Sequence, residues 1–185
     1  MEERDVQIRG YKIRLPVDVF VVASANPEDY TNRGRIITPL KDRYGSQIRT
    51  HYPETTDLEM EIMEQERSVF ETAGVNVTVP GFMREIVAEL THQARRSHDV
   101  SQRSGVSVRM SVANYENLIS NATRRAIRLG EKQAAPRISD LRALHSSTSG
   151  KIELETLGEV REEQVVDKLI SSAVQTTFNR HLSVR

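Results

Sequence analysis

A nearly continuous apolar run close to the start of the chain, residues 17–24, restricts the possible folds more than any other feature. The run is rich in β-branched residues, which is typical of a strand buried on both faces of a parallel sheet. Such a strand needs neighbouring strands and helices that cover it. Either the chain is the C-terminal portion of a longer α/β protein, or this strand pairs with another molecule; we favour the first explanation.

The sequence on either side of this run favours β structure and turns. Residues 6–15 alternate apolar and polar side chains with a break at Gly10, which predicts a β-hairpin. Pro39 stands at the position that proline tolerates best, the first turn of a helix, so a short helix is expected through Asp42. We therefore expect residues 1–53 to form one region, an α/β remnant.

From residue 54 onward, apolar side chains recur with helical spacing, so residues 54–185 are expected to form a second, mainly α-helical domain. The expected helices run from Thr55 or Thr56 to Gly74, from Pro80 past Leu90, over residues 108–129, from Pro136 past Leu144, and from Val165 to about Phe178. Residues 146–150, rich in serine, are expected to form a loop. The predicted fold is α-rich overall.

The sequence also predicts how the first of these helices begins and which of its faces is buried. Thr55 or Thr56 followed by Glu59 fits an N-cap with a capping box, in which the glutamate bonds back to the start of the helix. Apolar positions at Leu58, Ile62, Val69 and Phe70 are expected to face the core, and the acidic run over residues 59–66 is expected to form an exposed face.

Composition excludes several classes of function. The chain has no cysteine, which excludes disulfides, thiolate metal sites and a cysteine nucleophile. No apolar run approaches the roughly 20 residues that span a bilayer, and the first residues do not resemble a signal peptide. We therefore expect a cytoplasmic protein without a membrane partner. Lys and Arg number 26 against 26 Asp and Glu, and this balance argues against general nucleic-acid binding.

Asn26 and Arg43 are the first two candidate site residues. Asn26 follows the apolar run, so in a parallel sheet it would stand at the carboxyl edge, where ligands of open α/β folds bind. There its amide would orient a water molecule or contact a phosphate oxygen; alternatively, it only forms the turn before Pro27. Arg43 follows the short helix and has the chemistry to neutralise a transferring phosphoryl group, although a surface ion pair is the more frequent role of a single arginine.

Arg109 is the third candidate. Ser107 is a plausible N-cap, which places Arg109 in the first turn of the helix over residues 108–129. A cation is mildly unfavourable beside the positive end of a helix unless an anion joins it. The position is therefore suited to an anionic ligand such as a phosphate.

The remaining constellations are weak. The five histidines lack ligand-like partners, and the spacing of His92 and His98 does not place them on one helix face, so no metal site is expected. The basic cluster Arg124, Arg125 and Arg128 is read mainly as a solvated helix face, with DNA or an acidic protein as the less favoured alternative.

The blocks around Asn26 and Arg43 resemble a known family. The first is Ser-Ala-Asn-Pro-Glu-Asp-Tyr over residues 24–30, and the second is Arg-Gly-Arg-Ile-Ile-Thr-Pro-Leu-Lys-Asp-Arg-Tyr-Gly over residues 33–45. They look like the sensor-1 strand and the arginine-finger block of AAA+ ATPases, closest to the magnesium-chelatase I-subunit and MoxR-like group. The hairpin resembles the insertion before sensor 1 in that group. The match covers residues 1–53 tightly and the helical remainder loosely.

The resemblance implies roles for the three candidates. Asn26 corresponds to the polar residue of sensor 1, and Arg43 to the finger that acts on ATP of the neighbouring subunit. Arg109, in Gly-Val-Ser-Val-Arg, resembles the sensor-2 arginine that contacts the γ-phosphate in its own subunit. The intact protein would use ATP and Mg²⁺ and form a homo-oligomer, expected to be a hexamer. It would remodel a partner with a von Willebrand A-type domain.

The chain also departs from the family pattern. It lacks the phosphate-binding Gly-x-x-x-x-Gly-Lys-Ser/Thr; the nearest segment, residues 145–152, has Ile152 where the hydroxyl should be. No strand ending in Asp-Glu precedes the apolar run. We therefore expect the chain alone to bind no nucleotide tightly and to hydrolyse none. The alternative is a non-enzymatic helical module that binds a protein or DNA.

Overall fold

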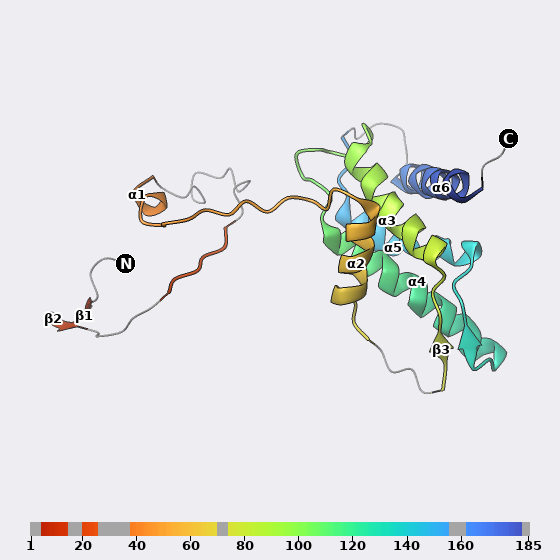
Figure 1. Cartoon of the computed structure of the whole chain (residues 1–185), viewed down its shortest axis with the longest axis horizontal. Helices are drawn as coiled ribbons and strands as arrows, with labels where there is room; N and C mark the ends of the chain where they lie inside the picture. Colours follow the sequence, from red (N-terminus) through yellow and green to blue (C-terminus); the bar gives the residue numbers. More distant parts are fainter. Residues whose placement is uncertain (1–4, 15–19, 26–37, 70–73, 156–161, 183–185) are drawn as a thin grey trace. The chain divides into compact units, whose positions relative to one another are not determined.

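The computed structural model describes residues 5–14, 20–25, 38–69, 74–155 and 162–182. The chain divides into two compact units, residues 1–50 and residues 51–185. Figure 1 labels the helices α1–α6 and the strands β1–β3. The described chain is mainly helical, which confirms the α-rich expectation.

The N-terminal unit contains the predicted hairpin. Strands β1 (Asp5–Ile8) and β2 (Tyr11–Arg14) pair antiparallel, with Ile8 opposite Tyr11. Arg9 and Gly10 form the two-residue turn with positive φ values of 50° and 87°, as tight hairpins require. The short helix α1 (Thr38–Lys41) follows, and it begins around Pro39 as expected.

The apolar run forms no strand in the part that the structure describes. Residues 20–25 have no regular structure, and residues 17–19 lie outside the described ranges. Phe20 is 94% exposed and Val22 is 79% exposed. A strand exists only where a neighbour completes its hydrogen-bond ladder, so β propensity alone did not produce one. The prediction of a buried strand is therefore wrong for the described residues of this unit.

The second unit is a helical bundle. Its main helices are α2 (Thr56–Glu66), α3 (Gly81–Arg96), α4 (Val108–Leu129), α5 (Leu144–Thr148) and α6 (Glu162–His181). Two 3₁₀ turns, η1 (Ile138–Ala143) and η2 (Ser149–Lys151), flank α5. Two short strands, β3 (Asn76–Val77) and β4 (Gln133–Ala134), pair in parallel beside α4.

Helix α4 has the bounds that its sequence signals predict. Ser107 is the N-cap, and its hydroxyl oxygen accepts a hydrogen bond from the Arg109 amide at 3.2 Å. Gly130 ends the helix in the left-handed conformation with φ of 68°, which a side chain would disfavour. Both ends are therefore set by local chemistry.

The core lies where α2, α4 and α6 pack around α3, as Figure 1 shows. Its largest fully buried side chains are apolar, with Tyr115 and one glutamate as the exceptions. The apolar members include Met63, Met83, Leu90, Met110, Leu118 and Leu144. Because α3 contributes to contacts on several sides, most of its residues are buried.

Helix α2 differs from its prediction in length and in its buried face. It ends at Glu66, not at Gly74. Leu58 is 46% exposed and Val69 is 75% exposed, whereas Glu59 and Met63 face the core. Phe70 lies outside the described residues. Glu59 is fully buried. The predicted capping box is therefore wrong for this residue, and the acidic run is not exposed along its whole length. The cause is tertiary, because Arg95 of α3 pairs with this carboxylate.

The segment expected to be a serine-rich loop is helical. Residues 146–148 belong to α5, and η2 continues from Ser149. Ser147 and Thr148 are buried, and both hydroxyl groups bond to the side chain of Asn114 on α4. These tertiary hydrogen bonds offset the weak helix propensity of Ser and Thr. Within the ranges that the structure describes, no helix is long and apolar enough to cross a membrane.

Candidate functional site

The three candidate residues lie in different parts of the chain, and the structure describes two of them. Asn26 lies outside the described residues. Arg43 follows α1 in the N-terminal unit, and its side chain is exposed. Arg109 belongs to the helical unit and is exposed in the first turn of α4. Because the two units are described separately, each arginine is considered in its own surroundings.

Arg109 extends from a firmly fixed helix start. Ser107 caps the Arg109 amide, and the Met110 amide donates to the Ser107 carbonyl at 2.9 Å. Within the described part of the chain, the Arg109 guanidinium makes no ion pair or hydrogen bond. The nearby helix end carries a partial positive charge. The guanidinium is therefore free to bind an anion that would also reduce this unfavourable field.

A buried ion pair lies beneath the start of α4. The Arg95 guanidinium of α3 donates two hydrogen bonds to the Glu59 carboxylate of α2, at 2.8 and 3.1 Å. Its Nε donates a third, at 3.0 Å, to the carbonyl oxygen of Val106, which precedes the cap of α4. The fork geometry satisfies both charges. One arginine thus joins α2, α3 and the loop before α4.

Hydroxyl groups extend this cluster along α4. The Ser111 hydroxyl donates to Glu59, and a 2.8 Å hydrogen bond joins Ser111 to Thr91 of α3. Both residues are fully buried. The first two turns of α4 are therefore tied to α2 and α3 by polar as well as apolar contacts.

His92 lies beside the same cluster but forms no hydrogen bond with Glu59. Its Nε2 atom lies 3.6 Å from Glu59, beyond hydrogen-bond distance, and has no partner within the described structure. Burial lowers the pKa of His92, and the nearby Glu59 carboxylate only partly opposes that effect. The imidazole is therefore neutral near pH 7.

The chain enters the helical unit through Tyr52, which packs on this cluster. The Arg95 guanidinium stacks over the Tyr52 ring, 4.4 Å from its centroid. The Tyr52 hydroxyl contacts the backbone at Gly105, whose φ is 67°. The entry segment, α3 and the loop before α4 thus meet at one point.

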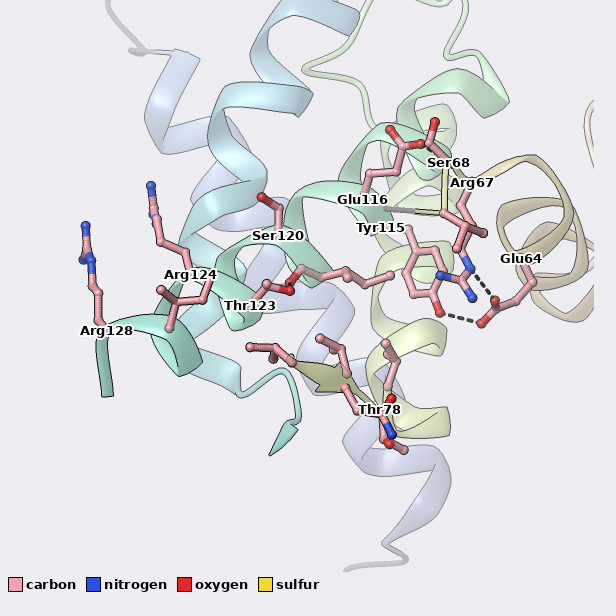
Figure 2. A pocket seen from close by; sticks show the side chains of 17 residues that line it. Glu64, Arg67, Ser68, Thr78, Tyr115, Glu116, Ser120, Thr123, Arg124 and Arg128 are labelled. Carbon is pink, nitrogen blue, oxygen red and sulfur yellow. Dashed lines mark hydrogen bonds and ion pairs between the residues drawn. The ribbon is translucent and has the colours of Figure 1, made fainter. Parts of the chain in front are cut away.

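A second feature of the helical unit is a groove of about 980 Å³ between α4, the end of α2 and the strand β3. Figure 2 shows the side chains that line it. Its apolar lining comes mainly from the valines of residues 75–79 and from Ile119 and Ile127. Such a lining is suited to apolar side chains of a ligand or partner.

At one end of the groove, Glu64 collects three donors. It accepts hydrogen bonds from the Tyr115 hydroxyl at 2.5 Å, from Arg67 at 2.8 Å and from Arg84 at 3.3 Å, and Figure 2 shows the first two. Burial raises the pKa of Glu64, but these donors outweigh it and lower the pKa. Burial and the Glu64 carboxylate raise the pKa of Tyr115 well above its usual range. The Glu64 carboxylate at this end of the groove is therefore already paired with side chains of the same unit.

The other end of the groove is basic. Arg124 and Arg128 are exposed and make no ion pair with any described residue, and Figure 2 shows them side by side on α4. Arg125 differs, because it pairs with the buried Asp140 at 2.9 Å. Burial raises the pKa of Asp140, but bonds from Arg125 and from the Arg137 amide outweigh that effect and lower it. The expected basic face is thus reduced to two exposed arginines that form no ion pair with a described residue, and Arg124 also donates a hydrogen bond to Asn121 at 2.6 Å.

Sequence reasoning missed the cluster around Glu59. Its spacing pattern places Glu59 four residues before Met63, on the same helix face, but a buried glutamate has no signature of its own. Gly105 follows Ser104 in a turn-like dipeptide, which indicates a turn and gives no hint of Tyr52. Across the described ranges, no cluster of three acidic or histidine residues could hold a metal ion.

Comparison of this chain with protein-family models, with curated proteins and with solved structures finds no match.

Proposed function

We propose that this chain is the C-terminal part of an AAA+ ATPase similar to the magnesium-chelatase I-subunit and MoxR-like group. In this proposal Arg109 contacts the γ-phosphate of nucleotide bound in its own subunit, and Arg43 acts on nucleotide of the neighbouring subunit. Asn26 orients the attacking water or contacts a phosphate oxygen. The oligomeric ring then remodels a partner protein.

The observation that carries the proposal is the placement of Arg109. An exposed guanidinium without a partner in the described structure stands in the first turn of a well-capped helix. The helix dipole makes this cation unfavourable in isolation and favourable when an anion bridges the guanidinium and the helix end. A triphosphate supplies such an anion.

Exposed apolar side chains in the N-terminal unit also support the proposal. Phe20, Val22 and Ile48 are 94%, 79% and 90% exposed. Large apolar side chains that are exposed are candidates for contact with another element. The sheet and helices of an AAA+ core would provide that contact.

The residues of this chain fit only part of an ATP site. Two arginines and an amide suit contacts to phosphate oxygens, while the sequence contains no Gly-rich phosphate loop. The described residues likewise contain no acidic cluster for Mg²⁺. When bound, Mg²⁺ would neutralise charge on the β- and γ-phosphates; its ligands would have to come from other segments of the intact protein.

The test uses the intact protein, with its nucleotide-binding loop, and single alanine variants. Arg43→Ala should lower ATP turnover by about 10³-fold or more while nucleotide binding stays nearly normal. Arg109→Ala should impair both binding and turnover. The exposed arginines Arg49 and Arg103 provide matched controls, and Arg49→Ala and Arg103→Ala should leave both quantities unchanged. Equal losses of binding in the Arg43 and Arg109 variants would contradict the trans role of Arg43.

Mixing the two variants tests the trans role directly. A site on an Arg43→Ala subunit is complete when its neighbour carries Arg109→Ala, since that neighbour supplies Arg43. In a ring with head-to-tail interfaces, random mixing should complete about a quarter of the sites. Turnover should therefore reappear when two inactive variants are mixed. No recovery in mixed rings of confirmed composition would overturn the assignment.

The isolated chain provides a further check. Without the phosphate loop, we expect no binding of ATP by calorimetry at micromolar to millimolar nucleotide. Saturable, tight binding of ATP by this chain would contradict the proposal that the phosphate-binding loop lies in another segment of the intact protein.

The groove on the helical unit favours a second candidate function, a non-enzymatic module that binds an acidic, apolar segment of a partner protein. Its apolar lining suits apolar side chains, and the exposed Arg124 and Arg128 at one end suit carboxylates. Binding would be measured by fluorescence anisotropy with an amphipathic acidic peptide and, separately, a DNA duplex. Loss of peptide binding in Arg124→Glu/Arg128→Glu, but not in the control Arg142→Glu, would support the module; binding of the duplex alone would replace the protein partner by DNA.

A further inference from the structure

Tyr52 stands where the chain enters the helical unit, and it touches two segments that are distant in sequence. The Arg95 guanidinium stacks 4.4 Å from the centroid of its ring. Its hydroxyl oxygen lies against Gly105, so closely that a β-carbon on this glycine would overlap it. The entry segment is therefore in contact with both α3 and the loop that leads into α4.

Arg95 makes this contact rigid. Its side chain is only 10% exposed and donates two hydrogen bonds to Glu59, which is fully buried. It also donates to the carbonyl of Val106 at 3.0 Å. Five fixed donor directions of a planar guanidinium leave little freedom once three are occupied. The ring of Tyr52 thus rests on a group that cannot shift without breaking a buried ion pair.

Gly105 transmits the contact to α4. It precedes Val106 and the cap residue Ser107 and adopts φ of 67°, a conformation that favours glycine. A displacement of Tyr52 would push on the Gly105 backbone or leave it unsupported. Two residues separate Gly105 from the first turn of α4, which carries Arg109.

We propose that Tyr52, Arg95 and Gly105 form a joint that couples the entry segment of the helical unit to the first turn of α4. The joint sets the position of Arg109, so that movement of the entry segment moves this guanidinium. Tyr52 and Arg95 are positioning residues, since they act through the helix start. The part of this inference that concerns nucleotide rests on the proposed function; the coupling itself does not.

The exposure of Tyr52 separates this role from ordinary core packing. Its ring is 46% exposed, whereas Tyr115, the buried tyrosine of the same unit, is 1% exposed. Tyr52 therefore contributes little to the core and lies at its edge, against the loop before α4. Altering the contact should loosen residues 105–110 more than it lowers the stability of the whole unit.

Two glycines allow a matched experiment in the full chain. Gly105 and Gly130 flank α4 with almost equal φ values of 67° and 68°, so an alanine is equally strained at either position. Only Gly105 has a neighbour, since no atom lies within 4 Å of a β-carbon built at Gly130. Gly130→Ala therefore controls for the effect of an equally strained alanine on the stability of the whole unit, and Gly105→Ala adds the collision with Tyr52.

A third variant relieves the collision. Removing the hydroxyl in Tyr52→Phe leaves the ring carbon Cζ as the nearest atom, 3.6 Å from a β-carbon at residue 105, which is an ordinary contact distance. Gly105→Ala/Tyr52→Phe then keeps the backbone strain at residue 105 and loses the collision. This rescue is specific to the contact, because it adds a second substitution and yet restores the local structure.

Hydrogen exchange measured by mass spectrometry provides the first readout. Gly105→Ala should speed exchange of the amides of residues 105–110 by about tenfold over the same amides in Gly130→Ala, a coupling of ordinary size for groups in contact. The double variant should slow exchange of these amides again, to the rate that backbone strain at residue 105 alone produces. Equal exchange in Gly105→Ala and Gly130→Ala, or no rescue by Tyr52→Phe, would overturn the joint.

ATP kinetics of the intact protein provide the second readout. Gly105→Ala should raise KM and lower kcat by smaller factors than Arg109→Ala, and Tyr52→Phe should rescue it. In an Arg109→Ala background, Gly105→Ala should cause no further loss, because the two changes act through the same guanidinium. If Arg109→Ala itself leaves kinetics unchanged, the proposed function fails while the exchange result still decides the joint. A full additional loss in the Arg109→Ala background would show that the joint does not act through Arg109.

Discussion

The two units of this chain differ in how far their apolar side chains are buried. In the helical unit, side chains such as Leu90, Leu118 and Met110 are fully buried between α3 and its neighbours. In the described part of the N-terminal unit, Phe20 and Ile48 are almost fully exposed. Apolar patterning specifies which residues require burial, and only the helical unit supplies its own partners. The difference teaches that apolar patterning alone does not bury a side chain; burial requires other elements that pack against it.

The largest expected effect tests whether the helical unit depends on its buried ion pair. Glu59→Ala leaves the Arg95 guanidinium buried without its carboxylate, so it should lower the free energy of unfolding by about 3–5 kcal/mol. Glu61→Ala, on an exposed position of the same helix, should change it by less than about 0.5 kcal/mol. Chemical denaturation measures both. A similar small loss in both variants would show that the pair does not anchor the unit.

A second pair of variants tests the contrast between the units directly. Leu118→Ala removes a fully buried side chain and should cost about 2–5 kcal/mol, because it leaves a cavity. Phe20→Ala, on a side chain that is 94% exposed, should cost less than about 0.5 kcal/mol in the isolated chain. If Phe20→Ala proves as costly as Leu118→Ala, the comparison between the two units is wrong.

Acidification should weaken the helical unit in two stages. Burial lowers the pKa of His92 below 6.5 in the folded state, so the unfolded chain binds more protons and stability falls as the pH drops below about 6.5. Stability falls a second time below about pH 4.5. In the folded state burial raises the pKa of Glu85, but hydrogen bonds from His181 and Arg180 outweigh it and lower the pKa.

Denaturation at several pH values measures both stages. His92→Gln should remove the first stage and leave the second. An unchanged first stage in this variant would assign it to another group.

The smallest expected effect is that of removing the N-terminal unit. Because the helical unit contains its own core, residues 51–185 alone should unfold cooperatively with a midpoint close to that of the full chain. Residues 1–50 alone should give no cooperative transition. A loss of cooperativity in the truncated helical unit would show that the two units depend on each other.

Local chemistry made several elements predictable. The hairpin follows from alternation around Gly10, and α4 follows from a serine cap, an apolar stripe and a terminal glycine. In both elements the signals lie within the element or next to it, so no distant contact was needed. Arg109 could be placed at an exposed helix start for the same reason.

Distant contacts decided what the sequence patterns did not predict. Glu59 looks like a capping residue, yet Arg95, thirty-six positions away, holds it in the core. Ser147 and Thr148 look like a loop, yet Asn114 of α4 satisfies their hydroxyl groups within a helix. Both errors arise because a polar side chain is assigned to solvent unless its partner is known.

The sequence by itself determined the hairpin around Gly10, both ends of α4 and the place of Arg109 in the first turn of that helix. The tertiary structure alone decided that a glutamate is buried, that an exposed tyrosine rests against the loop before α4, and that two arginines flank an apolar groove. Helix ends depend on groups a few residues apart, which the sequence lists in order. Burial and pairing depend on residues that only folding brings together.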